Sequence, residues 1–374
     1  MSKTFIYGKS VEGENFTDRV RETRRLQENF LHGLNTIIIS PRRIGKTSLV
    51  KRVKHLIDDS RVKVVLMDVY DCRSEYDFLN RFASVIIRET SGGNEKIVNS
   101  IKEFLARLTP KLSFSADPNH DISISLGITP KNYTPEEILN LPEIIAQKKG
   151  YEIVVCIDEF QQVGEFPDSL DVQKRMRGIW QHQQHVSYCL FGSKKHMMTD
   201  LFQNKRMPFY QFGDTMMLGK IGKRDWVDFI VSRFDSEGKS ISLEYAEGIC
   251  DKVECHSSYV QQLAGNILIE TVDVVTEECF ESGLTTLFEQ NTALFESQIA
   301  DLTSYQMNFL RAVCSGISTD FASKEVAEEY DFGSKSNIAR IKTALIKKEL
   351  IDIENQQVVI SDPVFKLWFV ANYM

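Results

Sequence analysis

Residues 35–50 read Asn35-Thr36-Ile37-Ile38-Ile39-Ser40-Pro41-Arg42-Arg43-Ile44-Gly45-Lys46-Thr47-Ser48-Leu49-Val50. An apolar, β-branched run stops at Ser-Pro, a short loop follows, and Gly-Lys-Thr stands directly before a helical pattern. This order of strand, loop and helix is typical of a phosphate site, because the loop amides wrap the phosphates and the helix directs its positive end at them. The stretch therefore predicts a nucleotide-binding loop.

Every residue of this loop is a candidate contact to the nucleotide. The candidates are Ser40, Pro41, Arg42, Arg43, Ile44, Gly45, Lys46, Thr47 and Ser48. We expect Lys46 to reach the β- and γ-phosphates and the Thr47 hydroxyl to bind Mg²⁺. The usual pattern opens with glycine where this chain has Ser40, and a Cβ there hinders close approach, although Pro41 stiffens the loop. A basic turn between core elements is the alternative.

A second signal is the run Ile153-Val154-Val155-Cys156-Ile157-Asp158-Glu159. A buried strand that ends in two carboxylates places them at the edge where parallel sheets hold ligands. Asp158 is predicted to hold Mg²⁺ with its water shell, and Glu159 to polarise the attacking water. A solvated strand end is the alternative.

The next apolar run, Tyr188–Phe191, is followed by Gly192, Ser193 and Lys194. A polar group at the tip of a strand beside the acidic strand is placed to sense the γ-phosphate, so Ser193 is a third catalytic candidate beside Glu159 and Lys46. Its alternative role is to cap the helix that begins at Lys194.

Short apolar runs separated by helical patterns predict a parallel sheet covered on both faces. The expected strands are Thr36–Ile39, Val62–Val69, Ile153–Ile157, Tyr188–Phe191 and Met216–Leu218. Residues 91–150 read as an insertion, with a helix near 95–108 and a hairpin over 112–125. After Leu218 the pattern is helical, and four helices are expected to form a bundle over 222–300.

The last 74 residues, 301–374, read as a winged helix. Three helices are expected at Ser304–Cys314, Ser323–Glu329 and Ser334–Lys348, followed by strands at Leu350–Ile353 and Val358–Ile360. On the third helix the apolar residues share one face, and Ser336, Arg340, Thr343 and Lys347 lie opposite. Five basic and no acidic residues fall between Ser334 and Lys348, which is typical of a recognition helix for duplex DNA. A solvated face on a protein-binding winged helix is the alternative.

Bulk properties limit the class of protein. A chain of 374 residues with 42% hydrophobic residues should form two or three domains with large cores. No apolar run approaches the roughly 18–20 residues of a membrane span, and the first residues lack an apolar signal region. The net charge of −7 excludes a wholly basic nucleic-acid coat, and seven cysteines without a C-x-x-C pair fit a reducing compartment. A cytoplasmic protein without a membrane partner is expected.

Together these motifs resemble the archaeal-type ATPase family, a branch of the AAA+/STAND class of P-loop NTPases. The run Phe16–Glu22 is similar to the family's opening F-x-x-R-x-x-E box, which places Arg19 near the adenine and ribose; a surface salt bridge is the alternative. Pro208-Phe209-Tyr210 is similar to the family's P-[LF]-Y segment. Asp362–Phe369 is similar to its closing D-P-x-F-x-x-W segment, which we expect to pack against the wing.

The resemblance implies an α/β fold, a P-loop NTPase αβα sandwich with a parallel five-stranded core sheet, a helical lid and a C-terminal winged helix. The domains would be 1–221, with the insertion, then 222–300 and 301–374. The implied activity is slow, Mg²⁺-dependent ATP hydrolysis that acts as a switch for DNA or a protein partner. GTP is less favoured because the sequence has no Asn-Lys-x-Asp box.

Two departures from the family leave alternatives open. The arginine that commonly follows the P-[LF]-Y segment is missing, so Arg206, Arg175 and Arg177 remain candidates for an arginine finger. The lid position that tends to carry a Gly-x-Pro turn reads His256-Ser257-Ser258-Tyr259. A DNA-binding regulator with negligible hydrolysis and a protein-interaction switch therefore remain alternatives, and the oligomeric state stays open.

Overall fold

The computed structural model describes residues 4–91 and 134–374, so the helix and hairpin expected over 95–125 lie outside the described residues. The chain forms two compact units. The core unit comprises Arg19–Gly219, and the helical unit comprises Lys220–Met374 with the N-terminal residues up to Asp18. This division falls close to the expected boundary at 221/222. A further boundary between lid and winged helix at 300/301 stays a prediction.

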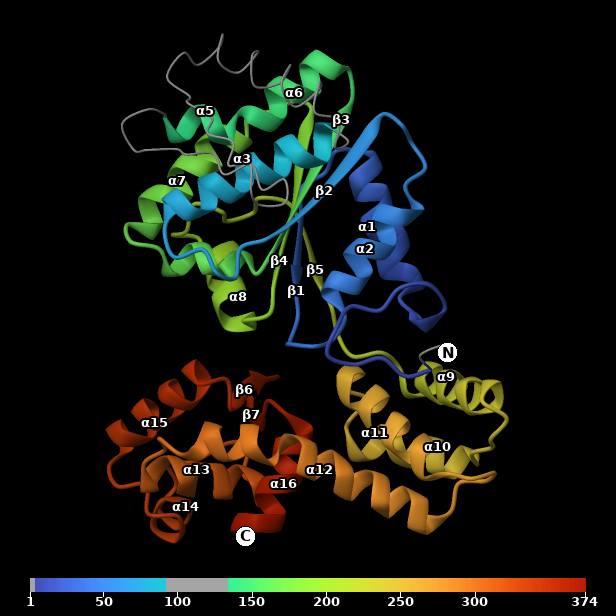
Figure 1. Ribbon diagram of the computed structural model, residues 1–374. Helices are drawn as coiled ribbons and strands as arrows, with labels where there is room; N and C mark the ends of the chain where they lie inside the picture. Colours follow the sequence, from blue (N-terminus) through green and yellow to red (C-terminus); the bar gives the residue numbers. More distant parts are fainter. Residues whose placement is uncertain (1–3, 92–133) are drawn as a thin grey trace, which may run out of the picture. The chain divides into compact units, whose positions relative to one another are not determined.

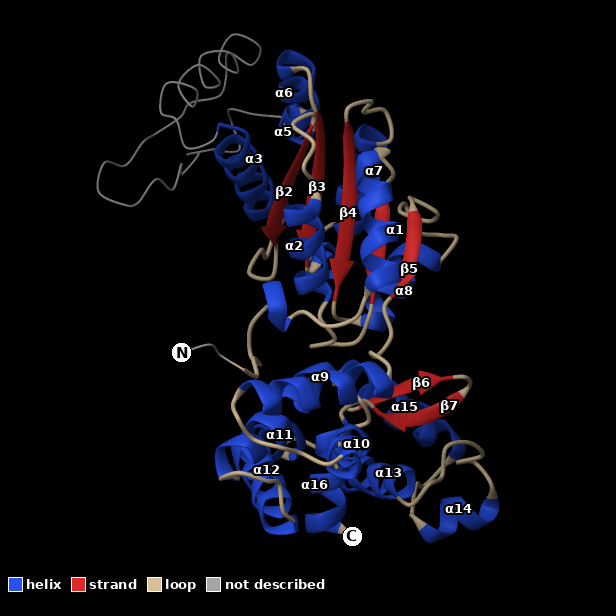
Figure 2. Cartoon of the chain, turned by 90° about the vertical axis from the view of Figure 1, so that its right-hand side faces the viewer, coloured by secondary structure: helices blue, strands red, loops and turns tan. Residues whose placement is uncertain are grey.

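The core unit contains a five-stranded parallel sheet, as the sequence predicted (Figure 2). The strands are β1 (Thr36–Ile39), β2 (Val62–Asp68), β3 (Glu152–Asp158), β4 (Val186–Gly192) and β5 (Asp214–Met217). Their order is β2-β3-β4-β1-β5. Every residue of β1 and β4 is buried, which explains why these strands read as continuous apolar runs.

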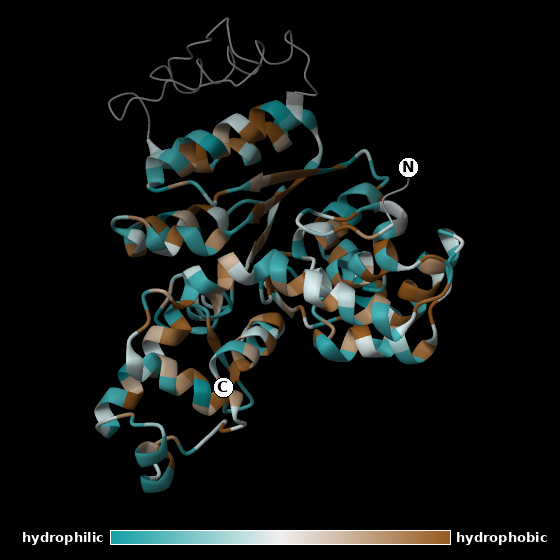
Figure 3. Ribbon diagram, turned by 60° about the horizontal axis from the view of Figure 1, so that its bottom comes forward, coloured by the Kyte–Doolittle hydropathy of each residue, from teal (hydrophilic) through white to brown (hydrophobic). Residues whose placement is uncertain are grey.

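Helices cover both faces of this sheet (Figure 1). On one side lie α1 (Val20–Leu31) and α2 (Lys46–Leu56). On the other lie α3 (Glu75–Ser91), α5 (Pro135–Leu139), α6 (Leu141–Lys149), η2 (Phe160–Glu165), α7 (Ser169–Trp180) and α8 (Lys195–Gln203). Ile37 and Ile39 belong to the hydrophobic cluster of this second side, whereas Ile38 between them points to the opposite face. The hydropathy colours of Figure 3 show hydrophobic residues along the strands and mixed residues on the helices.

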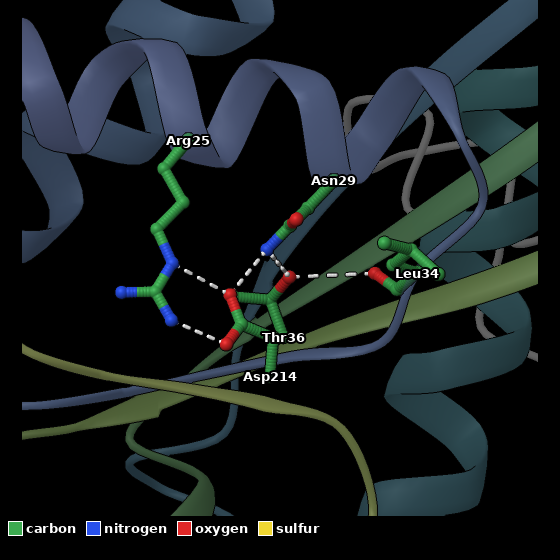
Figure 4. Close-up of polar contacts among 5 residues, drawn as sticks. All are labelled: Arg25, Asn29, Leu34, Thr36 and Asp214. Carbon is green, nitrogen blue, oxygen red and sulfur yellow. Dashed lines mark hydrogen bonds and ion pairs between the residues drawn. The ribbon is translucent and has the colours of Figure 1, made fainter.

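A polar network fixes α1 against the sheet (Figure 4). Asp214, at the start of the edge strand β5, accepts hydrogen bonds from the Arg25 guanidinium and, at 2.8 Å, from Asn29 Nδ2. Asn29 Nδ2 also donates to Thr36 Oγ1 at 3.1 Å, so one helix side chain contacts both β1 and β5. The Arg25 contact holds the pKa of the Asp214 carboxyl below its ordinary value. The position of α1 is therefore set by directional contacts as well as by packing.

The helical unit is built around one continuous hydrophobic cluster from Ile221 to Phe369. Its elements, after η1 (Gly13–Asn15), are α9 (Lys223–Ser236), α10 (Leu243–Lys252), α11 (Ser257–Glu270), α12 (Glu277–Ile299), α13 (Ser304–Cys314), α14 (Lys324–Glu329), α15 (Lys335–Lys347), β6 (Ile351–Glu354), β7 (Gln357–Ile360) and α16 (Pro363–Tyr373). The strands β6 and β7 form an antiparallel hairpin, visible in Figure 2. The lid and winged-helix segments therefore share one core.

The N-terminal residues pack onto this unit. The ring of Phe5 lies 6.1 Å from that of Phe229 and 6.0 Å from that of Phe234, and the Ile6 N–H donates to Gln261 Oε1 at 3.0 Å. These contacts explain why residues that the sequence assigned to the core domain group with the helical unit instead.

The closing helix α16 carries the D-P-x-F-x-x-W segment. Asp362 caps it by accepting hydrogen bonds from Val364 N and Phe365 N. Phe365 and Trp368 each lie 5.5 Å, ring to ring, from Phe295 of α12. The segment thus packs on the lid helix α12 as well as on β7 of the wing. Among the described residues no helix is both long enough and apolar enough to span a bilayer.

The buried Trp368 provides a test of this shared core. We expect Trp368→Ala to lower the free energy of unfolding by about 3–5 kcal/mol, because it leaves a cavity between α12 and α16. Val370→Ala, on an exposed position of the same helix, should change it by less than about 0.5 kcal/mol. Denaturant titration measures both, and equal effects would contradict the packing described.

Candidate functional site

The loop between β1 and α2 has the backbone that a phosphate site requires. Gly45 has a φ of 101° and directly precedes α2, and Arg43 has a φ of 58°. The left-handed conformation at Gly45 favours glycine, which is why only this position of the loop demands one. The first-turn amides of α2 have no partners within the helix, so the loop and the positive helix end together form a concentrated set of N–H donors.

Ser40 is accommodated without strain. Its side chain is buried, its Oγ donates to the Pro41 carbonyl at 2.9 Å, and its φ is not positive. The Cβ at this position therefore does not prevent the loop from forming. Of the other loop residues, Ile44 and Ser48 are buried, Pro41 is half-buried, and Arg42 and Arg43 are exposed.

The two predicted motifs meet in space. Thr47 Oγ1 donates a hydrogen bond of 2.6 Å to Asp158 Oδ2, although the two residues are 111 positions apart in sequence. Thr47 stands in the first turn of α2 and Asp158 ends β3, and β4 separates β3 from β1 in the sheet. A hydroxyl and a carboxylate are the hard oxygen ligands that Mg²⁺ prefers, so these two residues fit a magnesium site.

Asp158 lies in an environment that disfavours its negative charge. The pKa of this carboxyl is raised to about 6, chiefly by burial and also by the nearby charges of Glu159 and Asp68, while the Thr47 hydrogen bond and the Lys46 charge lower it. Asp68 is the register partner of Asp158 on β2. A bound cation would offset this concentration of negative charge.

Lys46 is buried as well, with 6% of its surface exposed. Its Nζ donates to the Pro41 carbonyl at 3.2 Å. Burial lowers the pKa of its ammonium group, while the Glu159 and Asp158 carboxylates raise it. The lysine is therefore held under the loop by one carbonyl and two nearby carboxylates, in a place where its charge is poorly solvated.

The predicted base and the predicted sensor are in direct contact. Ser193 Oγ donates to Glu159 Oε2 at 2.9 Å. Glu159 itself has a φ of 55° and stands before η2. Both its backbone turn and its side-chain contact therefore fix the direction of this carboxylate. Ser193 makes this contact from a position outside α8, which begins at Lys195.

Arg19 lies at the base of the same loop. Its side chain is 4% exposed and donates to the carbonyls of Ile44 at 3.3 Å and Gly219 at 2.6 Å, and it pairs with Glu22 at 3.1 Å. The salt bridge of the alternative is therefore present, but the guanidinium is buried and also bound to two backbone carbonyls. A nucleotide contact by Arg19 stays a prediction.

The three arginine-finger candidates differ in their surroundings. Arg175 pairs with Glu75 at 2.7 Å and Glu136 at 3.3 Å. Arg177 stacks on the Phe212 ring with 4.8 Å between the guanidinium carbon and the ring centre. The side chain of Arg206 is exposed on the loop after α8. A finger must leave its resting contacts to reach the nucleotide. Arg175 would have to break ion pairs and Arg177 its ring contact, whereas Arg206 is exposed.

Two residues of the site were missed in the sequence. Asp68, at the end of β2, was recognisable as a third acid at the carboxyl edge of the sheet. Gln161, whose Nε2 donates to Glu159 Oε2, gave no signal, because a glutamine three residues after a strand matches no motif.

The helix α15 has the two faces that its sequence predicted. Ile338, Ile341 and Leu345 are buried, and the four candidate DNA contacts, Ser336, Arg340, Thr343 and Lys347, are exposed. Two of these hydroxyls are already engaged within the helix, because Thr343 Oγ1 donates to Ala339 O and Ser336 Oγ bonds Ser334 Oγ.

Exposed acidic residues lie on the elements that precede and follow α15 in the sequence. Glu325, Glu328 and Glu329 lie on or near the surface of α14, and Glu354 is exposed at the end of β6. The winged-helix segment therefore carries charges of both signs on its surface.

The lid position that lacks a Gly-x-Pro turn connects to the winged-helix segment. Tyr259 Oη, in the first turn of α11, donates to Asp362 Oδ2 at 2.5 Å. The ring of Tyr259 is fully buried. The side chain that occupies this lid position thus contacts the N-terminal cap of α16.

Comparisons with known proteins agree with this architecture. Residues 293–371 match the family model described as "Probable winged helix domain". The structure is similar to that of the Walker-type ATPase of Pyrococcus abyssi, with a TM-score of 0.72 and 16% identity over 98% of this chain and 99% of that one. It is also similar to the ORC2 protein of Aeropyrum pernix, with a TM-score of 0.56 and 15% identity over 96% and 97% of the two chains. No curated protein matches the chain in sequence.

The fold is therefore the one seen in these ATPase and ORC2 structures: a five-stranded parallel sheet covered by helices, followed by helices that end in a winged helix. The resemblance to archaeal ATPases that the motifs predicted is confirmed at the level of the fold. At 15–16% identity the likeness extends over nearly the whole chain without fixing the activity.

The raised pKa of Asp158 gives a prediction for the nucleotide-free protein. Its ordinary value is 3.8 and its value in the fold is about 6, so above about pH 6 the fold carries the cost of a buried negative charge. We expect Asp158→Asn to raise the free energy of unfolding by about 3 kcal/mol at pH 7.5, with the gain disappearing below about pH 4. Denaturant titrations across this pH range measure it.

Asp58→Asn, the same change at an exposed position just after α2, is the control and should stay within about 0.5 kcal/mol. A loss of stability in Asp158→Asn at pH 7.5 would contradict the electrostatic account of this carboxylate.

Proposed function

We propose that the protein binds ATP with Mg²⁺ and hydrolyses it slowly, and that the nucleotide acts as a switch for the winged helix. The single observation that carries this proposal is the 2.6 Å contact between Thr47 and Asp158, with the buried Lys46 beside it. Neither motif alone distinguishes a nucleotide site from a turn or a solvated strand end, whereas their meeting places a helix N-terminus, an ammonium and a buried carboxylate together.

Each charged group has a role toward the triphosphate. The amides around Gly45 would surround the phosphates, and the Lys46 ammonium would leave Pro41 O to approach the β- and γ-phosphates. Thr47 and Asp158 are the residues that would hold Mg²⁺, which offsets the phosphate charge when bound. A nucleotide with Mg²⁺ would thereby offset the buried charges of both Asp158 and Lys46.

Hydrolysis would use Glu159 as general base. A water oxygen attacks the γ-phosphorus, the bond to the β–γ bridging oxygen breaks, and the proton of the water passes to the Glu159 carboxylate. Ser193, which bonds Glu159, is placed to exchange that contact for one with the γ-phosphate. Because no arginine finger is assigned, and a finger adds about 10³–10⁵ in rate, we expect slow turnover.

Two variants separate binding from hydrolysis. We expect Lys46→Ala to abolish ATP binding, because the phosphates lose their buried counter-charge, while Glu159→Gln keeps binding and loses turnover. Binding is measured by calorimetry and turnover by phosphate release. Lys63→Ala, on an exposed position of β2, should match the wild type in both. Wild-type turnover in Glu159→Gln would show that Glu159 is not the base.

For the winged helix we propose contact with duplex DNA through the exposed face of α15. The supporting observation is the run of five basic and no acidic residues from Ser334 to Lys348, with Arg340 and Lys347 exposed on that face. Contacts from such side chains to phosphates release counterions, so binding should weaken steeply with salt.

Salt titrations test this contact. We expect Arg340→Ala and Lys347→Ala each to weaken DNA binding and to reduce the salt slope by about one, as measured by fluorescence anisotropy at several salt concentrations. Lys324→Ala, a basic residue exposed on α14, is the matched control and should keep the wild-type slope. Binding that is absent at all salt concentrations removes DNA as the partner.

A protein partner is the second candidate, and the acidic side chains of α14 and β6 favour it. In that case the winged helix would bind a protein in a nucleotide-dependent way and DNA would have no effect on turnover.

A regulator that binds ATP with negligible hydrolysis is the third candidate function. Steady-state turnover with and without duplex DNA distinguishes it from the proposed ATPase. Mass measurement with a non-hydrolysable ATP analogue would show whether the nucleotide changes the oligomeric state.

A further inference from the structure

We propose that Gln161 is a positioning residue for Glu159, and that position 192 is glycine so that the Gln161 side chain can reach it. This inference rests on the proposed function, because it concerns the carboxylate assigned as the base. It adds a residue that no sequence motif singled out and a reason for a glycine that the backbone does not require.

The geometry at Glu159 is defined by two donors on one oxygen. Gln161 Nε2 and Ser193 Oγ both donate to Glu159 Oε2, the latter at 2.9 Å. They approach from different elements, since Gln161 belongs to η2 and Ser193 follows β4. Two donors on Oε2 fix the rotation of the carboxyl group and leave Oε1 as the oxygen for a water.

The burial of Gln161 shows that it is not an ordinary packing residue. Its side chain is 2% exposed, and its Oε1 has no hydrogen-bond partner among the described residues. A buried acceptor without a partner costs stability, and a leucine of similar size would fill the same space without that cost. The feature that a leucine cannot reproduce is the amide N–H directed at Glu159.

Gly192 is explained by the same side chain. Its φ is not positive, so conformational freedom does not demand glycine there. Space does, because a Cβ on Gly192 would lie 1.8 Å from Gln161 Oε1 and 3.0 Å from both Gln161 Cδ and Met198 Sδ. The carboxamide of Gln161 therefore occupies the place of a side chain at position 192, immediately before the second donor, Ser193.

Neutral donors suit this task. An amide and a hydroxyl orient a carboxylate without forming an ion pair with it, so the oxygen left free keeps its ability to accept a proton. Gln161 acts through Glu159 and is assigned no contact with the nucleotide. Its loss should therefore change turnover and leave nucleotide affinity intact.

Gln161→Leu is the first test, with ATP as substrate and the full-length protein. We expect kcat to fall about tenfold to a hundredfold, the range for losing one hydrogen bond to a charged group, with KM and the Kd for ATP unchanged. Gln162→Leu, the same change at the next residue, should leave kcat at the wild-type value. An unchanged or increased kcat in Gln161→Leu overturns the proposal.

Gly192 provides the second test. Gly192→Ala should displace the carboxamide, lower kcat as Gln161→Leu does, and lower stability. Adding Gln161→Ala to Gly192→Ala removes the clash, so we expect the unfolding midpoint to recover while kcat stays low. If kcat of the double variant recovered together with its stability, the loss in Gly192→Ala would come from packing alone. That result would overturn the positioning role of Gln161.

Failure of the proposed function is distinguishable from failure of this inference. If the wild type shows no turnover that depends on Glu159, the function fails, and the contact is then measured by a double-mutant cycle on unfolding with Glu159→Gln and Gln161→Leu. We expect the unfolding equilibrium constant of the double variant to depart at least fivefold from the product of the two single effects. Simple additivity would contradict the contact itself.

Discussion

The hydrogen bond between Thr47 and Asp158 is the contact on which the site depends. It exists because β3 and β1 lie one strand apart in the sheet and because α2 begins directly at the end of the loop that follows β1. A shift of one residue in the pairing of β3 with β4 would turn Asp158 to the other face of the sheet. The register Ile157↔Leu190 and the apolar residues of both strands therefore determine the chemistry at their ends.

Around this contact the charge balance is unfavourable, and the Thr47 hydrogen bond offsets it only in part. Burial raises the pKa of Asp158 and lowers that of Lys46, so the fold disfavours the charged form of each. Positive φ angles at Arg43 and Glu159 add backbone strain in the same small region. Proteins carry such costs at functional sites, where a ligand with the opposite charge offsets them. A polyanion accompanied by a cation is the ligand that would satisfy both buried groups at once.

The sequence predicted the sheet, its parallel direction and the two faces of α15, because these follow from periodicity, and periodicity is local. It also predicted Thr47 and Asp158, because each ends or begins a recognisable element. It could not predict that Arg19 binds the Ile44 and Gly219 carbonyls, or that Gln161 fills the space beside Gly192. Those contacts join positions whose sequence neighbours carry no pattern, and only the packed structure brings them together. The place of Phe5 among Phe229 and Phe234 was missed for the same reason.

The shared core of the lid and winged-helix segments limits how a nucleotide can act on the winged helix. Because α12 and α16 pack through Phe295 and Trp368, and Tyr259 bonds Asp362, separating these segments would expose a continuous hydrophobic cluster. A rearrangement that keeps this cluster buried must therefore occur where the chain enters and leaves the core unit, before Arg19 and after Gly219. At these two positions Arg19 has a left-handed backbone and its side chain donates to Gly219 O and to Ile44 O of the loop. One guanidinium thus links the loop between β1 and α2 to both ends of the core unit.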